Sequence, residues 1–337
     1  MCTTCGSRCG CAGCCSSIRE VVWSDGSNRN TQAFYFNQLG RAVLFISFTF
    51  LSLAILQLAN KMAGCPQNED GGYVDCGNRV YGAKPSSMLA LMAVASGVAT
   101  AAFMPFAGAV VDYSDYRRGF GIICATLLVA VNVAQIFIFE STWFAFAILQ
   151  GVVAGSTFMG NSMVMYSYIH AENEHKLHGI MASSRIWETS GMLGFLVIVA
   201  GVAMAFRFDS VETSRLSQTL ASVVGGIFLY LSYSRYKPVQ RQREVTEGKS
   251  LFLTGMISLW STIRGLGKTA PGAQRFLISI LFTEGSTGSF TSLAITCKFS
   301  PIHQLNFSFP YRKSHNPSLS SVVTFLCYRL KAGVGNV

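Results

Sequence analysis

The residues best suited to chemistry lie at the end of the second long apolar run, which reads FMPFAGAVVDYSDYRR from residue 103. Gly108 is followed by Asp112 and then by the adjacent pair Arg117 and Arg118. A small residue lets two helices approach closely, an acidic residue caps a short turn, and arginines bond helix-end carbonyls or a carboxylate. The pattern predicts a latch that holds one arrangement of helices and opens in another. A plain basic loop at a membrane surface is the alternative.

Polar side chains inside the apolar runs are few, and they are the second place where chemistry can reside. Amides there often hydrogen-bond between helices, whereas ionisable groups at membrane depth are costly and point to function. Glu188 can form an i,i+3 ion pair with Arg185 at the membrane edge. Proton coupling would use a buried carboxylate, for which Glu188 and Glu284 are the candidates. The predicted substrate-cavity residues are Gln57, Asn132, Gln135, Asn161, Glu188 and Glu284.

For two of these amides, bonding between helices is the favoured reading. Asn132 and Gln135 are one helical turn apart in the third apolar run, where they can join that helix to its neighbours. Asn161 lies in a run rich in Gly and Ser, GVVAGSTFMGNSMVMYSY, in which small residues permit either close packing or a cavity.

Cysteines fall into two groups that differ in their expected chemistry. Six crowd the N-terminus: Cys2, Cys5, Cys9, Cys11, Cys14 and Cys15. In a cytosolic tail these stay reduced, and the alternatives are S-acylation against the membrane, zinc binding, or no modification. Cys65 and Cys76 enclose ten residues rich in turn formers. In a non-cytosolic loop they are predicted to form a structural disulfide.

Enzyme chemistry finds no support in the sequence. The catalytic patterns G-x-S-x-G and H-E-x-x-H do not occur. Gly265-Leu-Gly-Lys-Thr269 imitates the end of a phosphate-binding loop, but Thr262 stands where that loop requires a glycine. We therefore expect no enzyme, no cofactor, no metal site and no nucleic-acid partner.

The elements that position these residues are set by composition. Charged residues make up 12% of the 337 residues, about half the usual share for soluble proteins, while 50% are hydrophobic. Apolar runs of about 20 residues each suffice to cross a bilayer as a helix. They are Ala42–Ala59, Met88–Val111, Phe120–Phe139, Trp143–Tyr168, Thr189–Phe206 and Leu216–Tyr233, with a weaker seventh at Phe276–Cys297. The predicted class is an all-α polytopic membrane protein whose partner is the lipid bilayer.

Orientation follows from the basic residues of the loops. With the N-terminus in the cytosol, 16 Lys and Arg residues face the cytosol and five face the other side. Positive loops stay inside, so a cytosolic N-terminus is predicted, and the first 40 residues lack a cleavable signal peptide. The predicted regions are a Cys-rich tail (1–40), six spans (41–236), a basic cytosolic loop (237–275), a partial seventh span (276–297) and an atypical tail (298–337).

The motif Gly108-x-x-x-Asp112-x-x-x-x-Arg117-Arg118 between the second and third spans resembles the signature loop of the major facilitator superfamily. Within it, the chain from about residue 35 to 297 is similar to the autophagy-related vacuolar amino-acid effluxers. The similar segments are KPSSMLALMAVASGVATAAFMPFAGAVVDYSDYRR, MVMYSYIHAENEHKLHGIMASSRIWETSGMLGF and RFLISILFTEGSTGSFTSLAIT.

This resemblance implies a fold and a function. The fold is the N-terminal six-helix half of a major facilitator, followed by the start of a seventh span. The function is export of amino acids, typically branched-chain or aromatic, from a vacuole or lysosome to the cytosol after autophagic breakdown. Asp112, Arg117 and Arg118 match the gating loop of the family.

The chain departs from this family in its length. Superfamily members have two six-helix halves, whereas here the sequence ends soon after the seventh run begins. The last 40 residues carry three prolines and no periodicity, so we expect a truncated gene model with a tail translated from non-coding sequence. Transport by such a chain would need a second half or a homo-oligomer. The competing reading is a non-transporting membrane scaffold or receptor with an acylated N-terminal tail.

Overall fold

The computed structural model describes residues 29–67, 73, 76–172, 177–237, 251–269, 271–272 and 275. These residues are almost entirely helical, with two isolated bridges, Gln67 to Tyr73 and Val80 to Ala83. The elements are α2 (Arg29–Met62), α3 (Pro85–Tyr113), α4 (Arg117–Gln135), α5 (Trp143–Ile148), η1 (Leu149–Ala154), α6 (Gly155–Glu172), α7 (Leu177–Phe206), α8 (Ser210–Arg235) and α9 (Leu251–Thr269). Six spans, α2, α3, α4, α5 to α6, α7 and α8, are long and apolar enough to cross a membrane.

The apolar side chains of these helices are not all covered by protein. On α7, Leu193, Val197 and Met204 are each more than half exposed. A soluble protein rarely leaves so many large apolar residues in water, whereas lipid tails accept them without cost. Length, composition and this exposure together define a helical multi-pass integral membrane protein.

Internal contacts divide the chain into two units. The larger contains α2 up to Ala54, α3 from Ala95, the helices from α4 to α8, and α9 up to Thr262. The smaller contains the rest of α2, the loop that follows it, α3 up to Val94 and α9 from Ile263. The residues of the latch and most of the polar side chains discussed below lie in the larger unit.

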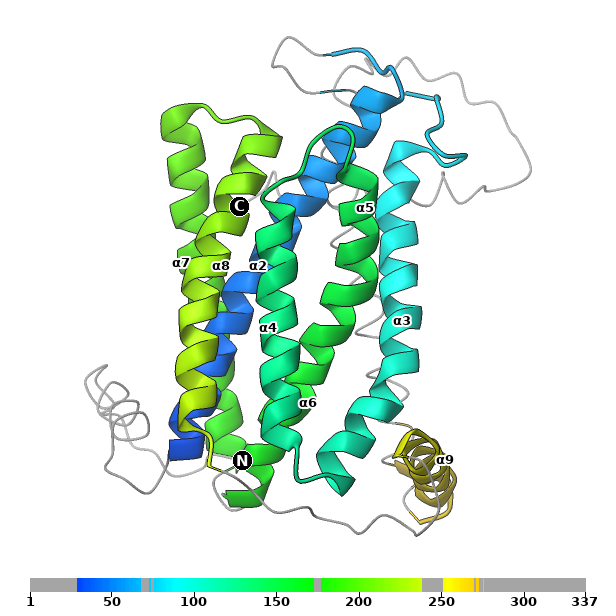
Figure 1. The fold of residues 1–337 in the computed structure, drawn as a ribbon, viewed down its shortest axis with the longest axis vertical. Coiled ribbons are helices and arrows are strands. Elements are labelled where there is room, and N and C mark those ends of the chain that lie inside the picture. The colour runs from blue at the N-terminus through cyan, green and yellow to red at the C-terminus, as the bar shows by residue number, and fades with distance from the viewer. Residues whose placement is uncertain are drawn as a thin grey trace, which may run out of the picture. The chain divides into compact units, whose positions relative to one another are not determined.

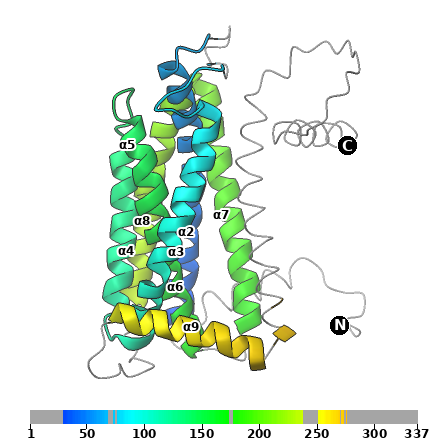
Figure 2. The ribbon, with the colours of Figure 1, turned by 90° about the vertical axis from the view of Figure 1, so that its right-hand side faces the viewer.

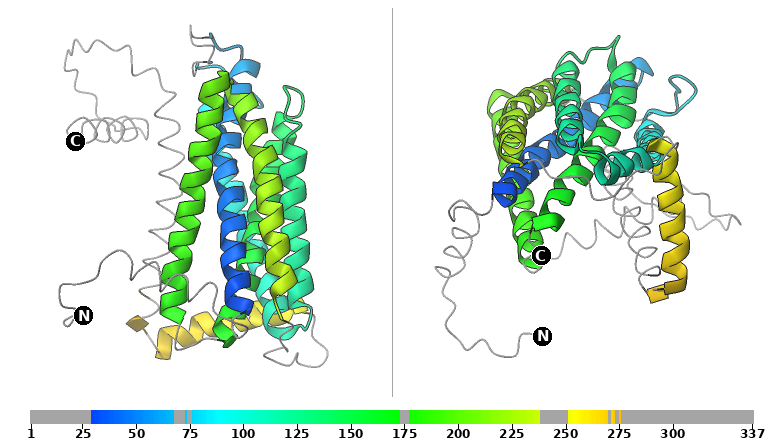
Figure 3. Two further views of the ribbon diagram at one scale, coloured as in Figure 1. Left: turned by 90° about the vertical axis from the view of Figure 1, so that its left-hand side faces the viewer. Right: turned by 60° about the horizontal axis from the view of Figure 1, so that its bottom comes forward.

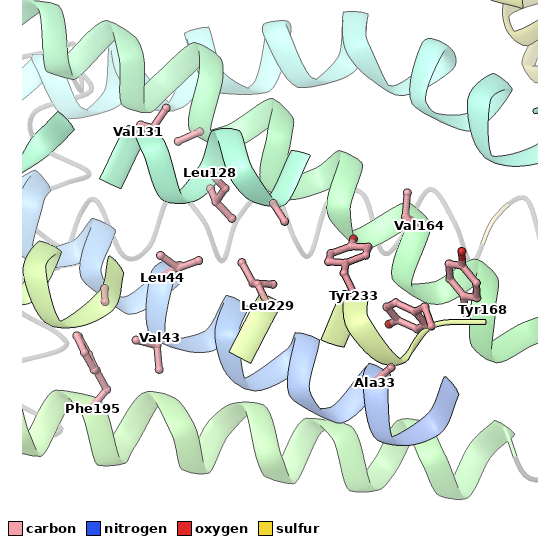
Figure 4. Packing of buried hydrophobic residues seen from close by; sticks show 14 of the residues in the cluster. Ala33, Val43, Leu44, Leu128, Val131, Val164, Tyr168, Phe195, Leu229 and Tyr233 are labelled. Carbon is pink, nitrogen blue, oxygen red and sulfur yellow. The ribbon is translucent and has the colours of Figure 1, made fainter. Parts of the chain in front are cut away.

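In the larger unit, α4 packs against both α8 and α6, and the three helices run side by side (Figures 1 and 3). Leu44 of α2, Leu128 of α4 and Leu229 of α8 converge in the apolar core (Figure 4). Helix α2 lies close to α8 at Gly40 and Gly225, where a Cβ atom on Gly40 would lie 3.1 Å from the carbonyl oxygen of Gly225. Two glycines facing each other allow this approach because neither carries a side chain.

The hairpin between α7 and α8 has a local cause. Arg207 takes a φ of 54°, which reverses the chain directly after α7 ends at Phe206. Asp209 then caps α8: the backbone N–H of Glu212 donates to Asp209 Oδ1 at 2.6 Å, and the Asp209 N–H donates to Glu212 Oε2 at 3.3 Å. This reciprocal capping box satisfies N–H groups at the start of the helix.

The segment predicted as a basic loop after the sixth span contains a helix. Helix α9 runs crosswise to α4 and α8 (Figure 2), and its exposed side chains include Phe252, Met256 and Trp260. Gly255 lies against α3, because a Cβ atom there would be 2.4 Å from the carbonyl oxygen of Pro105. A helix with an apolar exposed face and Lys268 in its last turn has the composition of one lying at a membrane surface.

In the smaller unit, Cys65 and Cys76 form a disulfide with their Cα atoms 5.5 Å apart. The same loop is tied to α2, since the Tyr73 N–H donates to Gln57 Oε1 at 3.0 Å and Asn78 Nδ2 donates to the Ala63 carbonyl at 2.9 Å. The pairing predicted from the loop composition is therefore present, and Gln57 has a structural partner in that loop.

A labelling experiment tests this disulfide in the protein itself. Alkylation of the denatured protein with a maleimide-linked polymer should add two more labels after reduction than before it. Replacing both residues, Cys65→Ser with Cys76→Ser, should remove that difference. The control Cys124→Ser removes a buried free thiol and should lower the label number by one under both conditions while keeping the difference of two. An unchanged difference in the double variant would show that other cysteines carry the bond.

Candidate functional site

Arg117 sits at the start of α4, in the predicted latch. Its side chain is 1% exposed, and its Nε donates to the carbonyl oxygen of Val111 near the end of α3 at 2.9 Å. Both terminal nitrogens, Nη1 and Nη2, are buried without a hydrogen-bond partner among the described residues. Because arginine keeps its charge, these nitrogens can donate hydrogen bonds to a carboxylate or to further carbonyl oxygens.

Arg118 holds a different helix end. Its Nε and Nη2 donate to the carbonyl oxygen of Tyr233, near the end of α8, at 3.1 and 2.7 Å. The adjacent arginines thus fasten the ends of α3 and α8 to the start of α4. This is the bonding to helix-end carbonyls that the sequence predicts for the pair.

The other two latch residues take a smaller part in the described geometry. Asp112 is half-buried and makes no ion pair with Arg117 or Arg118 in the described chain. A Cβ atom on Gly108 would lie 3.9 Å from Met163 Cε, which is ordinary contact. The close helix approach expected at Gly108 is therefore not required in this conformation.

A chain of buried hydrogen bonds, which we call the asparagine cluster, joins α2, α6 and α8 through Asn37, Asn161, Ser232 and Tyr233. The Tyr233 hydroxyl donates to Asn161 Oδ1, Asn161 Nδ2 donates to Asn37 Oδ1 at 2.9 Å, and Asn37 Nδ2 donates to Ser232 Oγ at 3.2 Å. All four residues are buried. Polar groups buried in protein need hydrogen-bond partners, so the cluster fixes how three helices meet.

The position of the Tyr233 ring depends on α4. A Cβ atom on Gly121 would lie 2.5 Å from the Tyr233 hydroxyl oxygen and 2.6 Å from a ring carbon. Only glycine leaves this space open, so Gly121 lets the hydroxyl reach Asn161. Figure 4 shows the Tyr233 and Tyr168 rings at one end of the apolar core. The Tyr236 ring contacts both, with its centroid 5.5 Å from that of Tyr233 and 4.3 Å from that of Tyr168.

A second polar group, which we call the arginine site, is centred on Arg41 of α2. Its guanidinium lies 4.1 Å from the centroid of the Phe158 ring, and its Nη1 donates to Gln38 Oε1 at 3.4 Å and to Met165 Sδ at 3.9 Å. Gln38 Nε2 in turn donates to the Tyr166 hydroxyl at 3.5 Å. These bonds are long, and the Arg41 side chain is only 5% exposed.

The two amides of the third span that were predicted to line a cavity bond different helices in the structure. Asn132 Oδ1 accepts from Ser47 of α2 at 3.1 Å, whereas Gln135 Nε2 donates to Gln150 Oε1 at 2.7 Å. Gln150 lies in η1, a π-helical turn between α5 and α6. Both amides therefore serve as bonds between helices, the reading favoured from their spacing.

The remaining predicted site residues are dispersed. Glu188 Oε2 pairs with Arg185 Nη1 at 2.8 Å, which is the i,i+3 ion pair expected at that edge. Glu284, the seventh span and the six N-terminal cysteines lie outside the described residues. An open cleft of about 580 Å³ runs along α4 and α8, and none of the predicted cavity residues lines it.

Sequence reasoning missed Arg41, Asn37 and Tyr233, because it began the first span at Ala42 and ended the sixth at Tyr233. Helix α2 begins 13 residues before Ala42, at Arg29. The spacing of Asn30, Asn37 and Arg41, seven and then four residues apart, is helical and was the available indication. Arg41, one of the 16 basic residues counted on the cytosolic side, is instead buried in the bundle.

The fold and its buried polar groups define the chain as a helical multi-pass membrane protein. Comparison of the chain with known protein families, with curated proteins and with solved structures gave no significant match.

Proposed function

We propose that the protein is a secondary transporter that works by alternating access. The observation that carries the proposal is the pairing of polar side chains across helices in the bundle, from Asn37 through Asn161 to Tyr233. Polar residues in a bilayer cost free energy and are retained where a hydrophilic path or site is built. The arginines at the start of α4 add a second support, because bonds to helix ends can break when helices shift.

The family proposal rests on the residue pattern. Gly108, Asp112, Arg117 and Arg118 follow the signature loop of the major facilitator superfamily, and the bundle has the six spans of one half of such a transporter. Following the similarity to vacuolar amino-acid effluxers, we propose amino acids as substrates and export to the cytosol as the direction, linked to autophagy. A second half or a second copy of the chain would supply the other wall of the site.

The proposed membrane is that of the vacuole or lysosome, with the N-terminus in the cytosol. Two features support this orientation. Basic residues are concentrated on the N-terminal side of the bilayer, and the disulfide between Cys65 and Cys76 belongs to the opposite side, where oxidation is favoured.

Transport is tested by reconstitution of the full chain into liposomes. Radiolabelled leucine or tyrosine should enter in counterflow at a rate well above that of empty liposomes. Arg117→Gln should lower the rate by about tenfold or more, since it removes charge-assisted bonds at a helix end. Arg79→Gln changes an exposed loop arginine and should leave the rate unchanged.

Two outcomes speak against the proposal. A folded protein without flux for any amino acid would favour the alternative of a membrane scaffold or receptor. Equal transport rates in Arg117→Gln and Arg79→Gln would show that transport does not depend on the latch.

A further inference from the structure

The side chain of Arg41 is buried in the bundle without a matching charge. It is 5% exposed, and its Nε has no hydrogen-bond partner among the described residues. The partners of Nη1 are weak: an amide oxygen at 3.4 Å and a thioether sulfur at 3.9 Å. A guanidinium has five N–H donors and cannot lose its charge in a protein, so much of its bonding capacity is left unused.

No carboxylate of the described chain lies close enough to Arg41 to bond its guanidinium directly. Arg41 makes no ion pair there, and Glu188, whose field attracts it, is bonded to Arg185 at 2.8 Å. Arg185 itself acts on Arg41 as a repelling charge. A buried cation held in this way is costly unless a partner arrives, which makes it a candidate for anion binding.

The surroundings of Arg41 are aromatic. Phe158 lies beneath the guanidinium, and its ring centroid is 5.7 Å from that of Phe45. Phe45 follows Arg41 by four residues in α2, so both lie on one face of the helix, and it is 47% exposed. A cation beside two phenyl rings matches a molecule with an acidic group next to an apolar group.

We infer that Arg41 binds the carboxylate of a small amphipathic acid whose apolar group packs on Phe45 and Phe158. A carboxylate accepts two parallel bonds from a guanidinium, and Nε is one of the two donors used in that geometry. Amino acids with apolar side chains fit this description. Their role as transported substrates rests on the proposed function, whereas binding of the carboxylate at Arg41 does not.

Binding by the unaltered full chain in detergent gives the first test, read as a ligand-dependent shift of the melting temperature and by equilibrium dialysis. Leucine and 4-methylpentanoate should both bind, because each joins a carboxylate to a branched apolar chain. Leucinamide has the same apolar chain without the carboxylate and should bind at least about tenfold more weakly. Inorganic phosphate should not compete with leucine. Equal binding of leucinamide and leucine, or binding of phosphate alone, would overturn the inference.

Variants give the second test. Arg41→Gln should weaken leucine binding by at least about thirtyfold, the usual effect of removing one member of a buried charge pair. Arg41→Lys keeps the charge without the bidentate geometry, and its leucine affinity should lie between those of the unaltered protein and Arg41→Gln. The control Arg215→Gln is matched, because Arg215 also lies over a phenyl ring, that of Phe139 at 4.6 Å, and donates to the Ile138 carbonyl. Its leucine affinity should stay unchanged.

The outcomes separate this inference from the transport proposal. Leucine affinity that is retained in Arg41→Gln but lost in Arg215→Gln would overturn the inference and would not contradict the transport proposal. Carboxylate-dependent binding at Arg41 in a chain without flux would support the inference and reject transport. If Arg41→Gln is not recovered as a folded protein, the leucine and leucinamide comparison and the Arg41→Lys variant decide.

Discussion

Replacing Gly225 by leucine is expected to lower the free energy of unfolding by at least about 3 kcal/mol, the upper end for overpacking a core. The same replacement at the next residue, Gly226, is expected to have little effect. A Cβ atom on Gly225 would lie 2.8 Å from Leu44 Cγ and 3.2 Å from the carbonyl oxygen of Gly40. At Gly226 the nearest atom would be Val129 Cγ1 at 3.7 Å, which is ordinary contact.

The cost at Gly225 arises from backbone as well as side chains. Leu44 can change its rotamer, but the carbonyl of Gly40 belongs to α2 and moves only if the two helices separate. The contact is reciprocal, since a Cβ atom on Gly40 would meet the Gly225 carbonyl at 3.1 Å. Separating the helices would also loosen the bond from Asn37 on α2 to Ser232 on α8.

The measurement is the melting temperature of the purified variants in detergent, with the elution profile as a check of folding. Gly225→Leu should melt far below the unaltered protein or fail to fold, and Gly225→Ala should show a smaller loss. Gly226→Leu and Gly226→Ala are the matched controls, because they change helix propensity in the same helix by the same amount. Equal melting temperatures for Gly225→Leu and Gly226→Leu would refute the close crossing of α2 and α8.

The membrane spans were the most predictable feature, because apolar length is a property of each segment alone. All six predicted runs lie within or largely within helices of the structure. Their ends differ for a physical reason. Helix α7 begins at Leu177, twelve residues before the predicted start at Thr189, since a helix continues for as long as its backbone bonds and packing allow, whatever its polarity. Hydropathy marks only the part that crosses hydrocarbon.

The polar contacts were less predictable than the spans. The ion pair of Glu188 with Arg185 and the disulfide of Cys65 with Cys76 are local in sequence, so spacing predicted both. Asn161 was recognised as a candidate, but its partners Asn37 and Tyr233 lie 124 and 72 residues away. Which distant side chains meet depends on how the helices pack, and no short pattern carries that information.

The arginine site was also not predictable from the local sequence. Arg41 directly precedes an uncharged run, so the sequence places it among the basic residues of the cytosolic side. Its burial follows from the extension of α2 and from the packing of α6, which brings Phe158 and Met165 over the guanidinium. The sign of the charge was evident from the sequence, but its unpaired state was not.

The hydrogen bond from Tyr233 to Asn161 is expected to show a coupling free energy of about 1 kcal/mol in a double-mutant cycle. This value lies between the average of about 0.6 kcal/mol and the maximum of about 1.7 kcal/mol for bonds between membrane helices. Asn161→Leu alone leaves the Tyr233 hydroxyl and Asn37 Oδ1 buried without their partner, at a cost of about 1–3 kcal/mol for each such group. Tyr233→Phe alone removes one donor to Asn161. The double variant should cost less than the two single changes added together.

The cycle has an internal control on the same bundle. Gln150 bonds Gln135 and shares no hydrogen-bond partner with Asn161 in the described chain, so Asn161→Leu and Gln150→Leu should add to within about 0.5 kcal/mol. Unfolding in detergent with a denaturing surfactant measures all variants. Additive losses at Asn161 and Tyr233 would mean that the two side chains do not meet in the folded protein. Coupling between Asn161 and Tyr233, together with additivity between Asn161 and Gln150, would place the junction of α2, α6 and α8 at the asparagine cluster. In that cluster Asn161 lies three residues from Phe158 in α6, and Asn37 lies four residues from Arg41 in α2. A loss of leucine affinity in Asn161→Leu with Arg41 intact would then identify that junction as the support that holds the arginine site in place.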